Sequence, residues 1–281
     1  MNKKKILIIS LIAIVELLAL TGCTNTISTD NNKKEGNSIS KVDENNIKQG
    51  DNNNVNINTG DTQDGKEGIF EIEYKEETYI TKNDNGEVVF ENKRNLPIIK
   101  SSKYANSAAK IQKSLTEISN KNWNDIKETS DEYKDSPSKA GVNYMLGTSV
   151  FGGNYISFMA NQSSSFGGTS WSAEELYTYD IETGELLNIN SFAKNEKEFK
   201  DFLMKKVTEY VKENFDKSAL SGLDSKVKAI IETSGNYGMQ YGSFSVILPK
   251  YSIGTGADGV KVVEISKDEI NSYLKDRYQI K

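Results

Sequence analysis

Apolar and polar side chains alternate at the start of the patterned part of the chain. In IFEIEYKEETYIT, residues 69–81, Phe70, Ile72 and Tyr74 occupy every second position, which predicts a half-buried strand. The turn sequence NDNG separates this run from a second apolar run at residues 88–90. We therefore expect the two runs to pair as a β-hairpin.

The spacing of apolar residues then changes to that of helices. Apolar side chains recur at helical spacing from Ala108 to Ile126, so a helix is predicted over residues 104–126. The same spacing predicts a second long helix over residues 197–215. A shorter helix is predicted around residues 227–231.

Alternation also marks the segments between and after these helices. Residues 141–162 predict two strands joined by a turn at 151–154. The stretch EELYTYDIETGELLNINSF predicts a further hairpin, with strands at 177–181 and 186–189. The turn between them is formed by residues 182–185.

The last patterned segments are two strands, FSVIL and VKVVEI, and a helix. The helix is predicted to start at a capping box, Ser266-Lys-Asp-Glu269, and to continue through Leu274. The elements together predict an α+β fold with mostly antiparallel sheets and helices packed on them.

The first 22 residues have the order of parts of a signal peptide. Three lysines precede an apolar run at residues 6–20, and small residues lead into Cys23, the single cysteine of the 281 residues. The run is shorter than a membrane-spanning helix needs and contains Glu16, which makes a permanent transmembrane segment the weaker interpretation. The sequence LTGC resembles the lipobox of bacterial lipoproteins, in which the cysteine thiol is lipidated by acyl chains such as palmitate. The alternative is an ordinary secretory signal with a stray thiol.

The segment after Cys23 is rich in Asn, Asp, Lys, Ser and Gly and has no aromatic residue through residue 68. Such a composition cannot bury enough apolar surface to offset its ordering entropy, so it predicts a disordered tether. The expected organisation is a signal peptide (1–22), a tether (23–68), a smaller α+β domain (69–135) and a C-terminal α+β domain (140–281).

Two stretches carry a resemblance to a known family. They are YTYDIETGELLNINSF and LPKYSIGTGADGVKVVEISKDEI, the second with Tyr251, Gly254, Asp258 and Gly259 in matching places. Residues 141–274 resemble a domain of unknown function found in bacterial cell-envelope proteins. Together with the preceding region, they are similar to the outer part of RsiV-like anti-sigma factors and to the non-catalytic region of peptidoglycan deacetylases.

The resemblance implies a lysozyme-binding module in the first case and a companion of a metal-dependent catalytic domain in the second. Neither an anti-sigma region nor a catalytic domain is expected in this chain. Family members often carry a loop of Gly-Gly-Ala-His type, whereas this chain has SSSFGGTSW at residues 163–171 and no histidine. A function that depends on that imidazole is therefore in doubt.

The absence of histidine narrows the chemistry further. It excludes Ser-His and Cys-His nucleophile pairs and removes the usual ligand of catalytic zinc. No phosphate-cradling GxxxxGK[ST] motif occurs, and Gly254-Thr-Gly256 lacks the third glycine and the helix of a dinucleotide site. A Ser-Lys dyad can be written at Ser136-Pro-Ser-Lys139, but without its companion motifs it is better interpreted as a polar loop.

Carboxylates remain as candidates for chemistry. Five of them, Glu174, Glu175, Asp180, Glu182 and Glu185, lie in one predicted hairpin, and a glycosidase needs two carboxyl groups about 5 to 10 Å apart. The simpler interpretation is a solvated hairpin edge whose charges oppose edge-to-edge pairing. A calcium site is conceivable, but the EF-hand spacing is missing. We assign no catalytic residue, metal or cofactor.

Aromatic residues in polar, glycine-rich stretches are the candidates for binding. Phe166 and Trp171 are expected in a Gly/Ser-rich loop, and Tyr237 and Tyr241 lie in GNYGMQYG. The alternative for such residues is packing in the core or at a sheet edge. Tyr251 and Asp258 complete the candidate set, although they can also serve only to fix a turn. Nucleic acid is not an expected partner, because the formal charge is −5 and basic residues are interspersed with acidic ones.

The sequence thus predicts a non-enzymatic, lipid-anchored binding module at the outer face of the bacterial cytoplasmic membrane. Its expected ligand is a lysozyme-like protein or cell-wall material such as peptidoglycan. Two alternatives stay open. One is a carboxylate-dependent hydrolase of wall glycans that uses Glu174, Glu175 and Asp180, and the other is a structural envelope lipoprotein.

Overall fold

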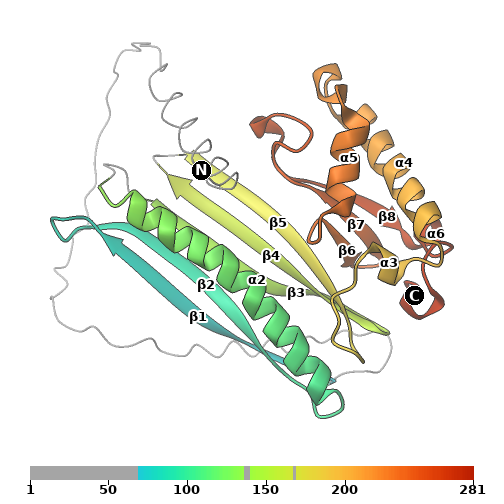
Figure 1. Cartoon of the computed structure of the whole chain (residues 1–281), viewed down its shortest axis with the longest axis horizontal. Coiled ribbons are helices and arrows are strands. Elements are labelled where there is room, and N and C mark those ends of the chain that lie inside the picture. The colour runs from blue at the N-terminus through green and yellow to red at the C-terminus, as the bar shows by residue number, and fades with distance from the viewer. Residues whose placement is uncertain (1–68, 136–139, 167–168) are drawn as a thin grey trace, which may run out of the picture. The chain divides into compact units, whose positions relative to one another are not determined.

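The computed structural model describes residues 69–135, 140–166 and 169–281. Within this part, five strands form a first sheet in the order β1-β2-β3-β4-β5 (Figure 1). Strands β2 and β3 are parallel, and the other neighbours are antiparallel. The strands are β1 (Glu71–Lys82), β2 (Val88–Lys100), β3 (Ala140–Gly152), β4 (Tyr155–Phe166) and β5 (Thr169–Asp180).

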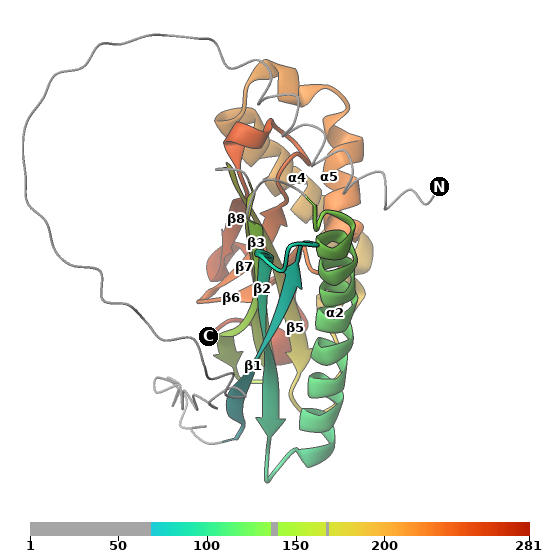
Figure 2. The same cartoon turned by 90° about the vertical axis from the view of Figure 1, so that its left-hand side faces the viewer.

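One long helix, α2 (Ala105–Glu132), connects the parallel strands β2 and β3 and lies along one face of the first sheet (Figure 2). Its apolar side chains recur at helical spacing, and Ile111 and Leu115 are fully buried. Facing them are alternate residues of the strands, including Phe158 and Tyr179, whose rings meet edge to face at 6.2 Å. Burial of these two complementary apolar faces stabilises the helix on the sheet.

A buried arginine connects the hairpin of β1 and β2 to helix α2. The Arg94 side chain donates to Glu77 Oε2 from Nε and Nη2, at 2.9 and 2.6 Å, and to Asn120 Oδ1 from Nη1 at 2.8 Å. Its guanidinium also lies 5.1 Å from the centre of the Trp123 ring. Burial alone would raise the pKa of Glu77, but hydrogen bonds from Arg94 and Lys75 and their charges hold it below its usual value.

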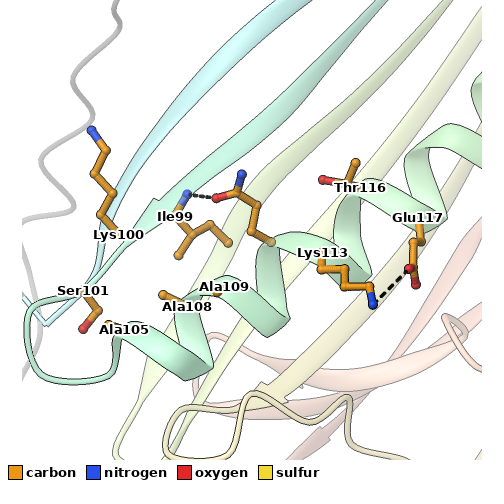
Figure 3. A pocket seen from close by; sticks show the side chains of 10 residues that line it. Ile99, Lys100, Ser101, Ala105, Ala108, Ala109, Lys113, Thr116 and Glu117 are labelled. Carbon is orange, nitrogen blue, oxygen red and sulfur yellow. Dashed lines mark hydrogen bonds and ion pairs between the residues drawn. The ribbon is translucent and has the colours of Figure 1, made fainter.

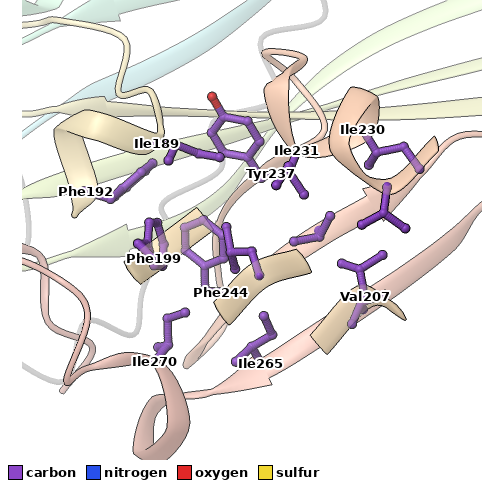
Figure 4. Close-up of a cluster of buried hydrophobic side chains, with 14 of the residues drawn as sticks. Ile189, Phe192, Phe199, Val207, Ile230, Ile231, Tyr237, Phe244, Ile265 and Ile270 are labelled. Atoms are coloured by element: carbon purple, nitrogen blue, oxygen red, sulfur yellow. The ribbon is translucent and has the colours of Figure 1, made fainter. Parts of the chain in front are cut away.

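The second sheet has three antiparallel strands in the order β6-β7-β8. Its core, shown in Figure 4, contains edge-to-face contacts of Phe244 with Phe199 and Phe192 at 5.5 and 5.4 Å. The strands are β6 (Tyr237–Gln240), β7 (Ser243–Leu248) and β8 (Lys261–Ser266). The helices of this part are α3 (Ile189–Phe192), α4 (Glu196–Asn214), α5 (Leu223–Glu232) and α6 (Lys267–Ile270), with 3₁₀ turns at Lys217–Leu220, Gly256–Asp258 and Asp276–Tyr278.

The two sheets are connected where β5 forms a parallel bridge with Asn236, just before β6. The amide of Leu176 donates to the Gly235 carbonyl at 2.7 Å, and the amide of Met239 donates to Thr178 Oγ1 at 3.0 Å. Thr178 also pairs with the Ser157 hydroxyl at 2.8 Å. Thr178 is therefore bonded both within the first sheet and to the second, whereas the buried hydroxyl of Ser245 on β7 has no partner among the described residues.

A carboxylate fixes the segment after α6 to the end of β5. Asp180 is only 2% exposed, and its Oδ2 accepts from the Tyr278 hydroxyl at 2.7 Å and lies 2.6 Å from Arg277 Nη2. Its Oδ1 accepts from the amides of Glu182 and Thr183, both at 2.9 Å. We call this group of contacts the Asp180 clamp. Burial would raise the pKa of Asp180, but the Tyr278 hydroxyl, the two amides and the Arg277 charge hold it below its usual value.

Most elements follow the pattern of the sequence, and the predicted α+β class is confirmed. The structure contains the predicted hairpin of residues 69–90 and the helices at 104–126 and 197–215. It also contains the capping box at Ser266 and Glu269. One sheet takes strands from both sides of residues 136–139, and the division into domains at 69–135 and 140–281 stays a prediction.

Three local predictions are wrong. The expected strand at 186–189 is a single bridge from Tyr179 to Leu186, because the Asn188 side chain caps the amide of Ser191 and starts α3. The final helix ends at Ile270 instead of Leu274. The expected loop at 163–171 is the end of β4 and the start of β5 around residues 167–168.

Several predicted features lie outside the described residues. They are the signal peptide, the lipidated Cys23, the tether through residue 68 and the polar loop at Ser136 and Lys139. Within the described ranges, no helix is long and apolar enough to cross a membrane.

Replacing Asp180 by asparagine should destabilise the fold by about 3 kcal/mol, since it leaves Arg277 and Tyr278 without their buried acceptor charge. Because the pKa of Asp180 is lower in the folded state, the clamp stabilises the protein above the unfolded-state value of about 3.9 and is lost as the pH falls below it. Urea unfolding at pH 7 and at acidic pH measures both effects. Glu182→Gln, an exposed partner of the same arginine, is the control and should change stability by less than about 0.5 kcal/mol. An equal loss in both variants would contradict this role of the clamp.

Two glycines with positive φ offer a matched test of how the 182–185 turn docks on α2. A Cβ at Gly184 would lie 2.7 Å from the Ser107 carbonyl oxygen, whereas a Cβ at Gly86 would meet nothing within 4 Å. Gly86→Ala should therefore lower the free energy of unfolding by about 1 kcal/mol, the strain of a left-handed backbone alone. Gly184→Ala should cost about 1 to 2 kcal/mol more, because the helix backbone cannot give way easily. Thermal unfolding of both variants compares them, and equal costs would argue against close docking of the turn.

Candidate functional site

The structure separates the six residues predicted to bind a ligand. Phe166 and Trp171 belong to strands β4 and β5 and not to a loop. Trp171 pairs with Ser164 and is half-buried, and its Nε1 is buried with no hydrogen-bond partner among the described residues. The position of Trp171 therefore fits packing at the sheet better than an exposed binding loop.

Tyr237 is also placed differently from the expectation. It lies in β6, is buried, and stacks on Phe244 with the ring centres 6.4 Å apart. Burial raises the pKa of its hydroxyl. Its ring is part of the core of the second sheet, so it presents no binding surface.

Two other predicted residues have exposed rings. Tyr241 is 77% exposed in the turn between β6 and β7, and Tyr251 is 51% exposed just after β7. Strand β7 spans six residues and separates them, which places the two rings about 20 Å apart along the strand. They therefore belong to two different surfaces.

Tyr251 has the more unusual backbone. Among the residues that the structure describes, it is the only one other than glycine with a positive φ, at 67°. This left-handed conformation costs a bulky residue about 1 to 2 kcal/mol. The loop holds it in place, because the Ser252 amide and hydroxyl both donate to the Pro249 carbonyl and Ile253 is buried in the core. Strain maintained by its surroundings is a frequent property of functional sites.

The ring of Tyr251 lies against a glycine of the same loop. A Cβ at Gly256 would come within 2.5 Å of the Tyr251 hydroxyl oxygen, so only glycine leaves room for the ring. The Lys250 ammonium lies 5.3 Å from the centre of the ring. Two residues of the loop thus contact an exposed aromatic side chain.

Asp258 fixes the other half of this loop. Its Oδ2 accepts from the amide and the hydroxyl of Thr255, at 2.6 and 2.8 Å, and closes a capping box on the Gly256–Asp258 turn. These hydrogen bonds hold the pKa of Asp258 below its usual value. Asp258 therefore has the turn-fixing role that the sequence offered as its alternative.

Two further aromatic residues lie at the end of α4 near this loop, where they pack against the core of the second sheet. Phe215, at the end of α4, lies against Gly254, where a Cβ would come within 2.8 Å of its ring. Tyr210 meets Phe215 edge to face at 6.5 Å, and both are half-buried. We call Tyr251, Phe215 and Tyr210 the aromatic platform. Sequence reasoning missed the last two because they follow the apolar spacing of α4 and read as core residues.

The carboxylates of the predicted hydrolase are not brought together. Glu174 and Glu175 are neighbours on β5 and point to opposite faces of the sheet, while Asp180 is engaged in the Asp180 clamp. Burial raises the pKa of Glu175, although the Tyr177 hydroxyl, Lys121 and Asn122 oppose this effect. In residues 69–135, 140–166 and 169–281, no three Cys, Asp or Glu side chains lie close enough to hold a metal ion.

A groove of about 540 Å³ lies between the end of β2 and the first half of α2 (Figure 3). Its wall on the helix is lined by alanines and by Gln112, whose Oε1 accepts from the Ile99 amide at 3.0 Å. Lys113 and Glu117 form an exposed ion pair at 3.9 Å along its rim. The groove is open, and its lining includes one carboxylate and no cysteine.

Comparison with known proteins relates the fold to two solved structures. One is a member of the DUF3298 family from Bacteroides fragilis NCTC 9343, with 13% identity over 76% of this chain and 98% of that chain and a TM-score of 0.51. The other is a DUF3298 family protein from Pseudomonas aeruginosa PAO1, with 11% identity over 74% and 94% of the two chains and a TM-score of 0.50. No family model and no curated protein matches the sequence. At these identities the comparison shows a shared fold, that of DUF3298-type domains.

Changing Tyr251 to glycine or to alanine should separate backbone strain from the contribution of the ring. Both variants lose the ring, but only glycine adopts the left-handed conformation without cost. The glycine variant should be the more stable of the two by about 1 kcal/mol, after allowing for its more flexible unfolded chain. Denaturant unfolding of both proteins measures the difference. Alanine equal to or better than glycine would show that Tyr251 is not strained.

Proposed function

We propose that this protein is a non-enzymatic binding module, anchored by lipid at Cys23 to the outer face of the bacterial cytoplasmic membrane. Its ligand is a lysozyme-like protein or cell-wall material, and its contact surface is the aromatic platform. The observation that carries the proposal is the fixed, strained and half-exposed ring of Tyr251.

The geometry of the loop supports binding, since recognition favours side chains that are ordered before the ligand arrives. Pre-ordering reduces the entropy lost on association, and aromatic residues are enriched where interfaces are strongest. Tyr251 is held by its backbone, by Gly256 against the hydroxyl end of its ring and by Lys250 near the ring. A ring held in this way at the surface contributes little to the core, which suggests that its position serves a contact.

The anchor and the location rest on the sequence. The LTGC motif follows a signal-like segment, and the Asn-rich stretch after it suits a spacer between the membrane and the folded part. The fold shared with DUF3298 family proteins agrees with the envelope-domain resemblance of residues 141–274. The hydrolase alternative gains no support from the arrangement of Glu174, Glu175 and Asp180, whose side chains point in different directions.

Calorimetric titration of the purified protein with lysozyme, and pull-down with purified peptidoglycan, test the proposal. The titration is done at 0.15 M salt, where screening over about 8 Å suppresses nonspecific attraction between an acidic and a basic protein. At least one of the two ligands should bind saturably. Tyr251→Ala should weaken that binding at least tenfold, equivalent to about 1.4 kcal/mol.

Tyr241→Ala is the matched control, because Tyr241 is more exposed than Tyr251 but lies at the other end of β7. Its affinity should stay within about twofold of the unmodified protein, a difference that corresponds to less than 0.5 kcal/mol. Absence of both interactions would overturn the proposal. Equal losses in the two variants would move the contact surface away from Tyr251.

A further inference from the structure

We infer that the outer edge of β1 is a self-association site, at which two copies of the chain pair antiparallel around Glu76. This edge contains no residue of the aromatic platform, so the site is additional to the proposed function and does not depend on it.

The two edges of the first sheet differ in their hydrogen bonding. At the β5 edge, the Leu176 amide donates to the Gly235 carbonyl at 2.7 Å, and the Leu187 amide donates to the Thr178 carbonyl at 2.8 Å. Strand β1 forms the other edge (Figure 1), and in the part of the chain that the structure describes no backbone group pairs with its outer side. Such a row of open donors and acceptors is a template for another strand.

The pairing with β2 identifies the residues of β1 whose backbone faces outward. A Cβ at Gly141 on β3 would lie 2.6 Å from the Glu91 carbonyl oxygen, so Glu91 points toward β3 and away from β1. Glu91 lies opposite Ile80, which must therefore point away from β2. The Asn83 amide, three residues on, donates across the hairpin to the Glu87 carbonyl at 2.9 Å, as this alternation requires. Even-numbered residues from 72 to 80 thus present their amide and carbonyl groups outward.

Strand β1 lacks several of the features that usually protect a sheet edge. It is 12 residues long, contains no proline, and has an irregular register only at its last step. The Glu77 carboxylate is paired with Arg94 and Lys75, at 2.6 and 3.2 Å. The Glu73 carboxylate lies 3.6 Å from Lys100 Nζ. These two acids are compensated within the chain, so they repel an incoming strand less than unpaired carboxylates would.

The charges of β1 favour a second copy of the same strand as the partner. Glu76 is the midpoint of residues 71–81, so antiparallel pairing around it aligns the regular part of the strand with itself over its whole length. Lys75 of each copy then lies opposite Glu77 of the other. Opposite charges placed directly across a ladder stabilise the pairing of two strands.

The same register brings apolar side chains together. Ile72 of each copy lies opposite Ile80 of the other, so this pair occurs twice in the dimer. Ile80 is 50% exposed in the single chain. Pairing would therefore remove apolar surface from water at both ends of the shared ladder.

Glu76 limits the strength of this pairing. It faces the same residue of the second copy, and like charges directly opposite each other are unfavourable. Within its own chain, Glu76 lies opposite Asn95 of β2, which carries no charge. The nearby Lys93 is paired with Glu91 at 2.8 Å. We therefore expect a weak, reversible dimer that strengthens when the charge of Glu76 is removed.

Disulfide formation between introduced cysteines tests the register. The full chain carries Cys23→Ser, so that the introduced thiol is the only one. Glu76→Cys places two thiols opposite each other at a Cα separation of about 5.5 Å, which a disulfide spans. Thr78→Cys is the control, because residue 78 faces Tyr74 of the second copy and its own equivalent lies more than about 13 Å away. Mild oxidation should link most of the Glu76→Cys chains and few of the Thr78→Cys chains.

Sedimentation velocity of the Cys23→Ser chain measures the strength of the dimer. Glu76→Gln should lower the dissociation constant at least fivefold, whereas Glu71→Gln, at a position that faces Thr81, should change it by less than twofold. Thr78→Pro removes an outward amide and should abolish the dimer with circular dichroism unchanged, since proline is tolerated where the amide of an edge strand faces outward.

Three results would overturn the inference. One is an equal disulfide yield at positions 76 and 78, and another is a monomer at every concentration for both the Cys23→Ser chain and its Glu76→Gln variant. The third is a dimer that persists in Thr78→Pro, because it would not use the edge of β1. These measurements contain neither lysozyme nor peptidoglycan, so their failure leaves the proposed function to its own test.

Discussion

Burial of β5 on both faces is the constraint on which the rest of this fold depends. Successive side chains of a strand point to opposite faces, so Tyr177 and Tyr179 enter the core under α2 while Leu176 and Thr178 face the second sheet. Each large side chain contributes about 1.5 to 3 kcal/mol when removed from water. Neither layer alone can cover this strand, and the helix and the second sheet are both required for it to be buried.

This two-sided arrangement also positions the aromatic platform. The second sheet has a compact aromatic core around Phe244, and the loop after β7 is tied to that core by Ile253. Tyr251 precedes this anchor by two residues and reaches the surface. A half-exposed ring on a rigid support is suited to specific binding, because little conformational entropy is lost when a ligand binds to it.

Periodicity predicted the helices and most strands correctly, because the buried residues of each element recur at a characteristic spacing. Ile111 and Leu115, which are fully buried, show this spacing in α2. It failed where a local side chain competes with pairing, as at Asn188, which caps a short helix in place of a strand. It also failed at Trp171, because serine and glycine suggested a loop where cross-strand pairing continues.

The candidate site could be predicted only in part for a similar reason. Tyr251 and Asp258 stood out because they lie at matching places of the family that residues 141–274 resemble. Phe215 and Tyr210 did not, since a half-buried aromatic residue at the end of an amphipathic helix has the same spacing as a core residue. Their place beside Gly254 depends on how α4 meets a loop some forty residues later, and no local pattern encodes that contact.

The Asp180 clamp sets an order of events for the newly made chain. Asp180 and Tyr278 are 98 positions apart, so the carboxylate has no partner hydroxyl until the whole of the second sheet, which ends at Ser266, has been synthesised. Contacts between residues so far apart in the sequence are associated with slower folding. Until the clamp closes, the end of β5 carries a charge that cannot be buried, and water must remain there.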